Sequence, residues 1–317
     1  MKVFVSSTSF FQPQNAAAQK LLHQYFDQVV TNDLGVPLKG EQILQRLQGC
    51  DAYIAGVDYI TADVIEAMPA SVRVISRYGV GVDRVDLAAA KRRGIPVTNT
   101  PGANSTAVCE LAFALMLAAA RNLPQLHQAV TDGAWPRSEG VELAGKTLGI
   151  VGLGAIGKRL ALRAKAFEMQ VLAYDPYFDT AFAAANDVTA ADLDTLFAQS
   201  DVISLHVPLN DATRHMVDKT RIAAMRDGAI LINTARGGLI DESAAAQAIL
   251  SGKLGGLGLD AFEQEPLKDS PLKGLPRVIF TPHTGAHTRE AVAQMGLMSV
   301  KNAIAILSGE PCACQVL

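Results

Sequence analysis

The chain has 317 residues, with 28 Lys and Arg against 31 Asp and Glu, a net charge near -3, and 49% hydrophobic but only 19% charged residues. This length predicts two domains, and the apolar fraction is typical of folded cores rather than of disorder. The near-neutral balance, without runs of Lys or Arg, argues against nucleic acid or an anionic membrane as the main partner.

The N-terminal segment Met1–Ser6 lacks the long apolar stretch of a signal peptide, and the longest apolar run, Leu111–Ala120, is about half a membrane span. We therefore expect a soluble, cytoplasmic protein. Of the four cysteines, Cys312 and Cys314 form a Cys-x-Cys pair with no second cluster or nearby His, so we expect free thiols and no metal site.

The first hundred residues alternate short apolar runs with helical patterns, which indicates a smaller α/β domain. The expected strands are Val3–Ser6, Ala52–Ala55, Val74–Ser76 and Pro96–Thr98. Asn104-Ser105-Thr106 then forms a natural N-cap for an almost wholly apolar helix up to Arg121, which must be buried between layers or subunits.

The middle of the chain shows the same alternation more clearly and predicts a six-stranded, doubly wound parallel-sheet domain. The expected strands are Thr147–Val151, Gln170–Tyr174, Val202–Leu205, Ala229–Ile232, Gly256–Leu259 and Val278–Phe280. A last helical stretch, Thr288–Ser308, is expected to return to the first domain. We therefore place one domain at residues 1–100 plus 288–317 and the other at 101–287.

A glycine-rich turn follows the first strand of the middle domain. Gly152, Gly154 and Gly157 form G-x-G-x-x-G directly after Val151, and a helical run begins at Ala155. The first glycine permits a tight turn, the second lets a pyrophosphate approach the backbone, and the third lets helix and strand pack closely. Although a structural glycine turn is the alternative, the complete strand–turn–helix context favours a dinucleotide site.

Asp175 follows the next strand, 23 residues after the first glycine, where a carboxylate binds the adenosine ribose hydroxyls. A carboxylate there repels a 2'-phosphate, and Tyr174-Asp175-Pro176-Tyr177 offers no Arg or Lys to bind one. We therefore expect NAD rather than NADP as the cofactor.

Polar residues follow several expected strands and so converge on the edge of the sheet where ligands bind. They are Asp175, His206, Asn233-Thr234-Ala235-Arg236, Asp260 and His283. Hydride transfer at an alcohol carbon needs a base in one direction and an acid in the other, and histidine serves both. His283 is the best candidate, with Glu265 to hold its ring and Arg236 to bind a carboxylate.

Each assignment has an alternative at this stage. Glu265 is also consistent with a solvated loop charge, and Arg236 with a salt bridge at a helix entry. His206 is expected to line the adenosine side, whereas the remaining histidines are assigned to packing or capping.

The chain resembles the D-isomer-specific 2-hydroxyacid dehydrogenases, which include phosphoglycerate, glycerate and D-lactate dehydrogenases. The resemblance covers nearly the whole chain and rests on the segments 145–154, 233–238, 258–266 and 282–286. It implies that Arg236, Glu265 and His283 are the catalytic set. It also implies a homodimer, with a Rossmann domain inserted into a smaller flavodoxin-like substrate domain.

The resemblance also implies further contacts to NAD and to the substrate. The NAD contacts are Thr106, Ala155, Ile156, Asp175, His206, Val207, Pro208, Thr234, Ala235, Asp260, Gly285 and Ala286, beside Gly152, Gly154 and Gly157. The substrate loop comprises Arg77, Tyr78, Gly79, Val80 and Gly81, whose backbone N–H groups are suited to cradling a carboxylate.

Two departures set the chain apart from the phosphoglycerate enzymes that it otherwise resembles most. Where those enzymes have an Arg-Ser pair, this chain has Ala55-Gly56-Val57-Asp58, so phosphate recognition is expected to depend largely on Arg77, with an acid close by. The sequence also ends at Leu317, which leaves no length for their C-terminal regulatory domain, and we expect no feedback through such a domain.

We therefore expect an NAD-dependent oxidoreductase that interconverts a small D-2-hydroxy acid and its 2-keto acid. Two alternatives remain at this point. One is a phosphoglycerate dehydrogenase proper. The other is a non-catalytic, NAD-sensing protein like the corepressors that share the family fold.

Overall fold

The computed structural model describes all residues from Met1 to Leu317 and divides them into two compact units. Unit 1 comprises Met1–Asn104 and Ala286–Leu317, and unit 2 comprises Ser105–Gly285. The chain therefore leaves unit 1, forms the whole of unit 2 and returns. The sequence had placed these two crossings at residues 100 and 287.

Unit 1 is built on a five-stranded, fully parallel sheet with strand order β2-β1-β3-β4-β5, which is the flavodoxin-like order. Its strands are β1 (Lys2–Val5), β2 (Gln28–Thr31), β3 (Ala52–Ala55), β4 (Val74–Arg77) and β5 (Val97–Thr98). Its helices are η1 (Pro13–Asn15), α1 (Ala16–Tyr25), α2 (Glu41–Arg46), α3 (Ala62–Glu66), α4 (Leu87–Arg92) and α12 (Arg289–Leu307).

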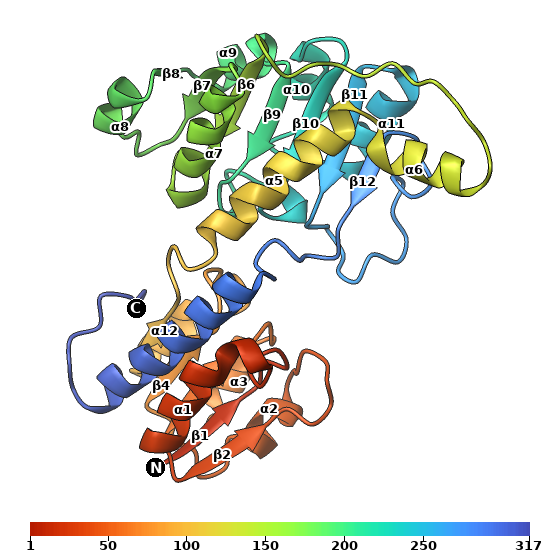
Figure 1. The fold of residues 1–317 in the computed structure, drawn as a ribbon. Helices are drawn as coiled ribbons and strands as arrows, with labels where there is room; N and C mark the ends of the chain where they lie inside the picture. The colour runs from red at the N-terminus through yellow and green to blue at the C-terminus, as the bar shows by residue number, and fades with distance from the viewer. The chain divides into compact units, whose positions relative to one another are not determined.

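The two faces of this sheet carry separate cores. Helices α2, α3 and α4 contribute to one buried cluster, and α1 and α12 contribute to the other (Figure 1). The expected return of the last helix to the first domain is therefore observed. Its start is fixed by Thr288, whose side chain accepts a hydrogen bond from the backbone N–H of Ala291.

Unit 2 has a seven-stranded, fully parallel sheet in the order β12-β11-β10-β9-β6-β7-β8. Its strands are β6 (Thr147–Val151), β7 (Gln170–Tyr174), β8 (Val188–Ala190), β9 (Val202–Leu205), β10 (Ala229–Asn233), β11 (Leu254–Leu259) and β12 (Val278–Phe280). The order reverses between β6 and β9, as in the doubly wound dinucleotide-binding fold, where ligands bind at such a reversal.

Helices cover both faces of this second sheet. They are α5 (Ser105–Ala120), α6 (Leu123–Thr131), α7 (Ala155–Ala166), α8 (Thr180–Ala185), α9 (Leu193–Gln199), α10 (Lys219–Ala224), η2 (Gly237–Leu239) and α11 (Glu242–Ser251). The apolar helix α5 packs with α7 on one face, and α9, α10 and α11 pack on the other (Figure 1). Burial of α5 in this layer explains why its sequence is apolar all round.

The prediction of six strands in this domain was wrong by one strand. β8 has only three residues, of which Thr189 and Ala190 are exposed, so it lacks the apolar run that marks a buried strand. The strand β2 of unit 1 was missed as well, and none of its residues is fully buried. Both strands lie at the edge of their sheet.

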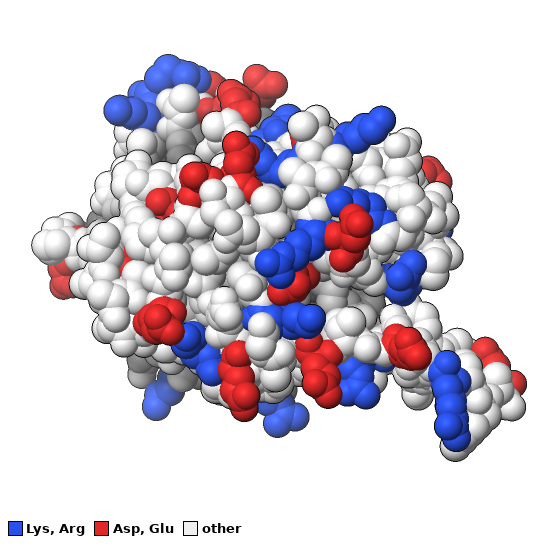
Figure 2. Space-filling model, turned by 90° about the horizontal axis from the view of Figure 1, so that it is seen from above, with Lys and Arg blue, Asp and Glu red and all other residues white.

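No single helix is long and apolar enough to span a membrane, although α5 and α6, bent by 64° at their junction, meet the length and composition criteria when taken together. On the face drawn in Figure 2, Lys and Arg side chains are interspersed with Asp and Glu, without a large area of one sign. All four cysteines are free thiols, and Cys50 and Cys109 are buried.

Candidate active site

The glycine turn of unit 2 has the geometry that a bound pyrophosphate requires. Gly152 has a φ of +102°, and a Cβ there would lie 2.7 Å from the backbone of His206. A Cβ on Gly157 would lie 2.1 Å from the carbonyl oxygen of Gly152. A Cβ on Gly154, in contrast, would meet nothing within 4 Å, so the fold itself does not require a glycine there. Gly154 instead leaves open space at the N-terminus of α7, where uncapped N–H groups favour an anion.

Asp175 joins this turn to the end of β7. Its Oδ2 accepts a hydrogen bond from the N–H of Leu153 at 2.7 Å, and its Oδ1 accepts one from the N–H of Tyr177 at 2.8 Å. An open pocket of about 330 Å³ lies beside it, lined by Tyr174, Asp175, Phe178, Ala190, Ala191 and Asp192. The carboxylate is therefore held at a pocket mouth beside the glycine turn, the position from which a ribose diol is bound.

Two buried polar atoms at the carboxyl ends of β9 and β10 have no hydrogen-bond partner, namely Nδ1 of His206 and Oγ1 of Thr234. The other ring nitrogen of His206 lies 2.8 Å from Oγ of Ser204. Burial lowers the pKa of His206 to about 4, so the ring is neutral at physiological pH. Buried polar atoms are rarely left unpaired, so these two fit a ligand that brings hydrogen-bonding groups to this edge.

The remaining predicted NAD contacts lie in several segments. Thr106 is exposed in the first turn of α5, and Ala155 and Ile156 are the first two residues of α7. Val207 and Pro208 follow β9, and Ala235 follows β10. Gly285 is the last residue of unit 2, whereas Ala286 begins the second segment of unit 1 and packs against its core. Their contacts with NAD stay predictions.

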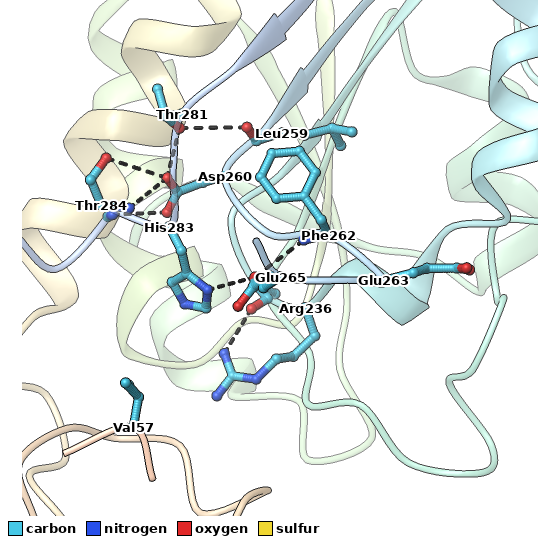
Figure 3. Close-up of polar contacts among 12 residues, drawn as sticks. Val57, Arg236, Leu259, Asp260, Phe262, Glu263, Glu265, Thr281, His283 and Thr284 are labelled. Carbon is cyan, nitrogen blue, oxygen red and sulfur yellow. Dashed lines mark hydrogen bonds and ion pairs between the residues drawn. The ribbon is translucent and has the colours of Figure 1, made fainter. Parts of the chain in front are cut away.

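The predicted catalytic residues come from three separate segments of unit 2, and Figure 3 shows their side chains converging. Nδ1 of His283 lies 2.7 Å from Oε1 of Glu265, which also accepts a hydrogen bond from the N–H of Phe262 at 3.3 Å. The His283 side chain is 47% exposed, against 22% for Glu265. The His283 imidazole is therefore open to solvent, whereas the Glu265 carboxylate that it contacts is more buried.

Arg236 lies at the start of the turn that follows β10. The amide of Asn233, which is fully buried, donates from Nδ2 to the backbone oxygen of Arg236 at 2.8 Å and accepts from the N–H of Ala235 at 3.0 Å. The Arg236 guanidinium donates to the carbonyl of Ala235 at 2.7 Å. The half-buried arginine is thus anchored through its backbone at the same sheet edge as His283.

Gly237 allows the arginine turn to touch the loop that carries Glu265. A Cβ at this position would lie 1.8 Å from the carbonyl carbon of Phe262 and 2.2 Å from the nitrogen of Glu263. Any side chain at Gly237 would therefore separate Arg236 from the Glu265 loop.

Asp260 holds the segment that presents His283 (Figure 3). Its carboxylate, 1% exposed, accepts hydrogen bonds from Oγ1 of Thr281 at 2.6 Å and from the N–H groups of Thr284 and Gly285, each at 2.8 Å. His283 itself has a φ of +52°, which is costly for a non-glycine residue. The buried carboxylate stabilises this strained turn, so Asp260 positions the histidine, and its contact with NAD stays a prediction.

The predicted substrate loop lies in unit 1, where two of its side chains are buried. Arg77 is 6% exposed and donates from Nη1 to the carbonyl of Ala55 at 2.7 Å and from Nε to that of Gly81 at 3.0 Å. The guanidinium thus ties two segments of unit 1 together, and a role of Arg77 in phosphate recognition stays a prediction. Tyr78 is also buried, and its hydroxyl donates to the carbonyl of Val292 at 3.2 Å.

Asp58 is likewise internal rather than an acid in the substrate pocket. It is 1% exposed and accepts hydrogen bonds from the Ser6 hydroxyl, from the Tyr53 hydroxyl at 2.8 Å and from the N–H of Leu38 at 2.7 Å. Near the loop surface, Gly79 has a φ of +149° and the side chain of Val80 is 37% exposed. The backbone of residues 79–81 remains as the predicted carboxylate cradle.

A model of the D-isomer specific 2-hydroxyacid dehydrogenase, NAD binding domain, matches residues 113–285. The chain is 42% identical over 295 residues to a hydroxypyruvate reductase of Thermotoga maritima, which covers 91% of this chain and 94% of that protein. The chain belongs to the D-isomer-specific 2-hydroxyacid dehydrogenases. The predicted resemblance and the α/β fold class are thereby confirmed, and unit 2 is an NAD-binding domain of this family.

Other relatives of this chain differ from it in length, and their names give different substrates. It is 44% identical over 282 residues to a D-3-phosphoglycerate dehydrogenase of Methanocaldococcus jannaschii, but spans about half of that protein, 54% of its length. Among solved structures, it matches a D-lactate dehydrogenase from Aquifex aeolicus complexed with NAD and lactic acid, with a TM-score of 0.84 and 30% identity, covering 98% of this chain and 96% of that one.

Proposed function

We propose that this dehydrogenase reversibly reduces a small 2-keto acid to the D-2-hydroxy acid with NADH. The observation that carries the proposal is the 2.7 Å contact between His283 and Glu265, beside Arg236 at the carboxyl edge of an NAD-binding sheet. The set combines a proton carrier, a carboxylate that supports it and a guanidinium for an acid substrate. A purely NAD-sensing protein would not need these three groups together.

The chemistry assigned to each side chain follows from its position. Arg236 binds the carboxylate of the keto acid and polarises its carbonyl oxygen. The His283 ring, protonated and paired with Glu265, donates its proton to that oxygen as the alcohol forms, and in the reverse direction it accepts the hydroxyl proton. When bound, NADH supplies the hydride that reduces the carbonyl carbon.

The glycine turn, Asp175 and the unpaired atoms of His206 and Thr234 are the groups that would hold NAD. Asp175 favours NAD over NADP because a carboxylate repels the 2'-phosphate. One solved relative, an imino acid reductase, is in complex with NADPH, so NADPH is the comparison cofactor in the test below.

We propose that the substrate is unphosphorylated. Arg77 is 6% exposed and its guanidinium donates to the carbonyls of Ala55 and Gly81, and this burial disfavours its use as a phosphate ligand. Two relatives that match this chain over 94% of their own length are named hydroxypyruvate reductase and glyoxylate reductase, and these names support an unphosphorylated substrate. Phosphoglycerate dehydrogenase activity remains the alternative to be tested alongside it.

The test is the loss of NADH absorbance with glyoxylate, hydroxypyruvate, pyruvate, phosphohydroxypyruvate and branched 2-keto acids, repeated with NADPH. Turnover of an unphosphorylated acid with NADH, abolished in His283→Ala, is expected. Preference for phosphohydroxypyruvate would favour a phosphoglycerate dehydrogenase. NADH binding with no turnover across the panel would instead favour the NAD-sensing protein.

The proposal extends to a cytoplasmic homodimer. Helix α6 has no buried residue, and large apolar side chains stand exposed on and after it, including Val130 at 50% and Trp135 at 83%. Such exposed apolar side chains favour a partner surface. Light scattering should give twice the monomer mass of 33.5 kDa, and Trp135→Ser should reduce the dimer fraction.

A further inference from the structure

Glu265 lies in a loop without regular secondary structure, between β11 and β12. The position of its carboxylate therefore depends on contacts made by the loop with the rest of unit 2. The N–H of Phe262 donates to Oε1 of Glu265 at 3.3 Å, so the backbone at residue 262, which is bonded directly to residue 263, helps to set where this carboxylate lies.

Glu242 binds the loop on both sides of Glu265. Its Oε1 accepts the backbone N–H of Glu263 at 3.0 Å, and its Oε2 accepts the hydroxyl of Ser270 at 2.6 Å. The residue is only 8% exposed, although it carries a carboxylate. A buried carboxylate with two such bonds costs stability when either partner is removed.

The element that carries Glu242 is well placed to act as a fixed support. Glu242 is the first residue of α11, where a negative charge is favoured by the helix dipole. The same helix is anchored in the core of unit 2 by Ala245 and Ile249, which are 0% and 1% exposed. The loop is thus tied to a rigid helix rather than to another loop.

Two further contacts act on the same part of the loop. The side chain of Glu263 pairs with Nε2 of His215 at 2.5 Å, and its backbone packs against Gly237. The backbone N–H of Glu263 is left to Glu242 alone. The contacts form a chain from Glu242 through Glu263 and Phe262 to Glu265, and from there to His283.

We propose that Glu242 is a positioning residue for the acid–base couple: it holds the Glu265 loop so that the carboxylate stays against the imidazole of His283. The proposal rests on the proposed function for its kinetic readout. Without Glu242, Glu265 supports the protonated imidazole less well, so the alkaline fall in kcat should begin at a lower pH.

The experiment compares Glu242→Ala, Glu242→Gln and Ser270→Ala with the wild type in kcat, KM for NADH and the pH profile of kcat. Glu242→Ala should lower kcat at least tenfold, move the alkaline limb to lower pH and leave KM for NADH within twofold. Glu242→Gln should recover most of the loss, because an amide oxygen still accepts from Glu263 and the Ser270 hydroxyl is able to accept instead of donate. Ser270→Ala should give an intermediate shift.

The matched control is Asp194→Ala, another acidic residue in the first turn of a unit 2 helix, but with a side chain 93% exposed. It should leave both kcat and the pH profile unchanged. If Glu242→Ala lowers only the melting temperature and keeps the wild-type pH profile, the residue is merely structural and the proposal is overturned. If that variant does not fold, an unchanged pH profile in Ser270→Ala overturns it equally.

An NMR titration of the His283 ring separates this proposal from the proposed function, because it needs no turnover. A titration midpoint that differs between Glu242→Ala and the wild type supports positioning, even if no keto acid is reduced. Identical midpoints in folded proteins overturn it, even if the enzyme is active.

Discussion

Nδ1 of His283 lies 2.7 Å from Oε1 of Glu265, although the two residues are 18 positions apart in the sequence. The contact exists because two loops after neighbouring strands, β11 and β12, end at the same edge of the sheet. One loop supplies the carboxylate and the other the imidazole. The pair is therefore a product of sheet topology rather than of local sequence.

Glu265→Gln should lower kcat by about a hundredfold, the lower end of the range for acid–base catalysis, because the imidazole itself remains. A neutral amide cannot stabilise a protonated ring as a carboxylate does, so the alkaline limb of the kcat profile should move to lower pH. The measurement is kcat between pH 5 and 10 with saturating NADH. Exposed Glu142→Gln is the control, and parallel profiles for all three proteins would contradict the assignment.

Gly154→Ala should weaken NADH binding about tenfold or more without loss of stability. The new methyl group meets nothing within 4 Å in the protein, but it fills the space into which a pyrophosphate would fit. Gly157→Ala is the matched contrast, because its Cβ would lie 2.1 Å from the carbonyl oxygen of Gly152 and should destabilise the fold itself. Thermal melting and NADH fluorescence titration check both. Unweakened NADH binding in Gly154→Ala would mean that the glycine turn is only structural.

The sequence located the central strands β6, β9 and β10 well because every residue of these strands is buried. β6, β7 and β9 begin and end at the residues that the apolar runs indicated, whereas β10 and β11 extend one and two residues further. The edge strands β2 and β8 were missed because partial exposure removes the continuous apolar run. Strand order depends on tertiary contacts, which local periodicity does not encode.

Side-chain direction could not be read from the sequence. Arg77 is the last residue of β4 and Asp58 follows β3, and the sequence placed both near the substrate. Both are instead buried among backbone and hydroxyl partners from segments distant in sequence. Glu242 was missed for the same reason, because its partners at Glu263 and Ser270 are more than 20 residues away.

Asp260→Ala should destabilise unit 2 by about 2 to 5 kcal/mol, because the buried N–H groups of Thr284 and Gly285 lose their acceptor. It should also lower kcat, since the strained turn at His283 loses its support. Asp260→Asn keeps one acceptor oxygen and should lie between the wild type and the alanine variant. Urea unfolding followed by circular dichroism measures the stability. Equal midpoints and slopes for Asp260→Ala and the wild type would refute the anchoring role.

His206 should make the stability of unit 2 fall in acid. Its pKa is about 4 in the folded protein because burial disfavours the charged ring, against about 6.5 in an unfolded chain. Above pH 6.5 the ring is neutral in both states and contributes no pH dependence. As the pH falls from about 6.5 to 4, only the unfolded state binds the proton, so the unfolding free energy should drop by up to about 1.4 kcal/mol per pH unit, and it should level off below pH 4.

The checking variant is His206→Gln, whose amide retains a polar group near Oγ of Ser204 but does not titrate. Urea unfolding at pH 7.5, 6 and 5 should show a shallower pH dependence in this variant than in the wild type. Carboxylates such as Asp179, whose pKa is lowered by its hydrogen bond with Lys158, also lose stabilising contacts in acid, but they do so in both proteins and cancel in the comparison. Exposed His23→Gln should follow the wild type. If His206→Gln also shows the pH dependence of the wild type, burial does not hold the His206 ring neutral, and this residue has no effect on stability in acid.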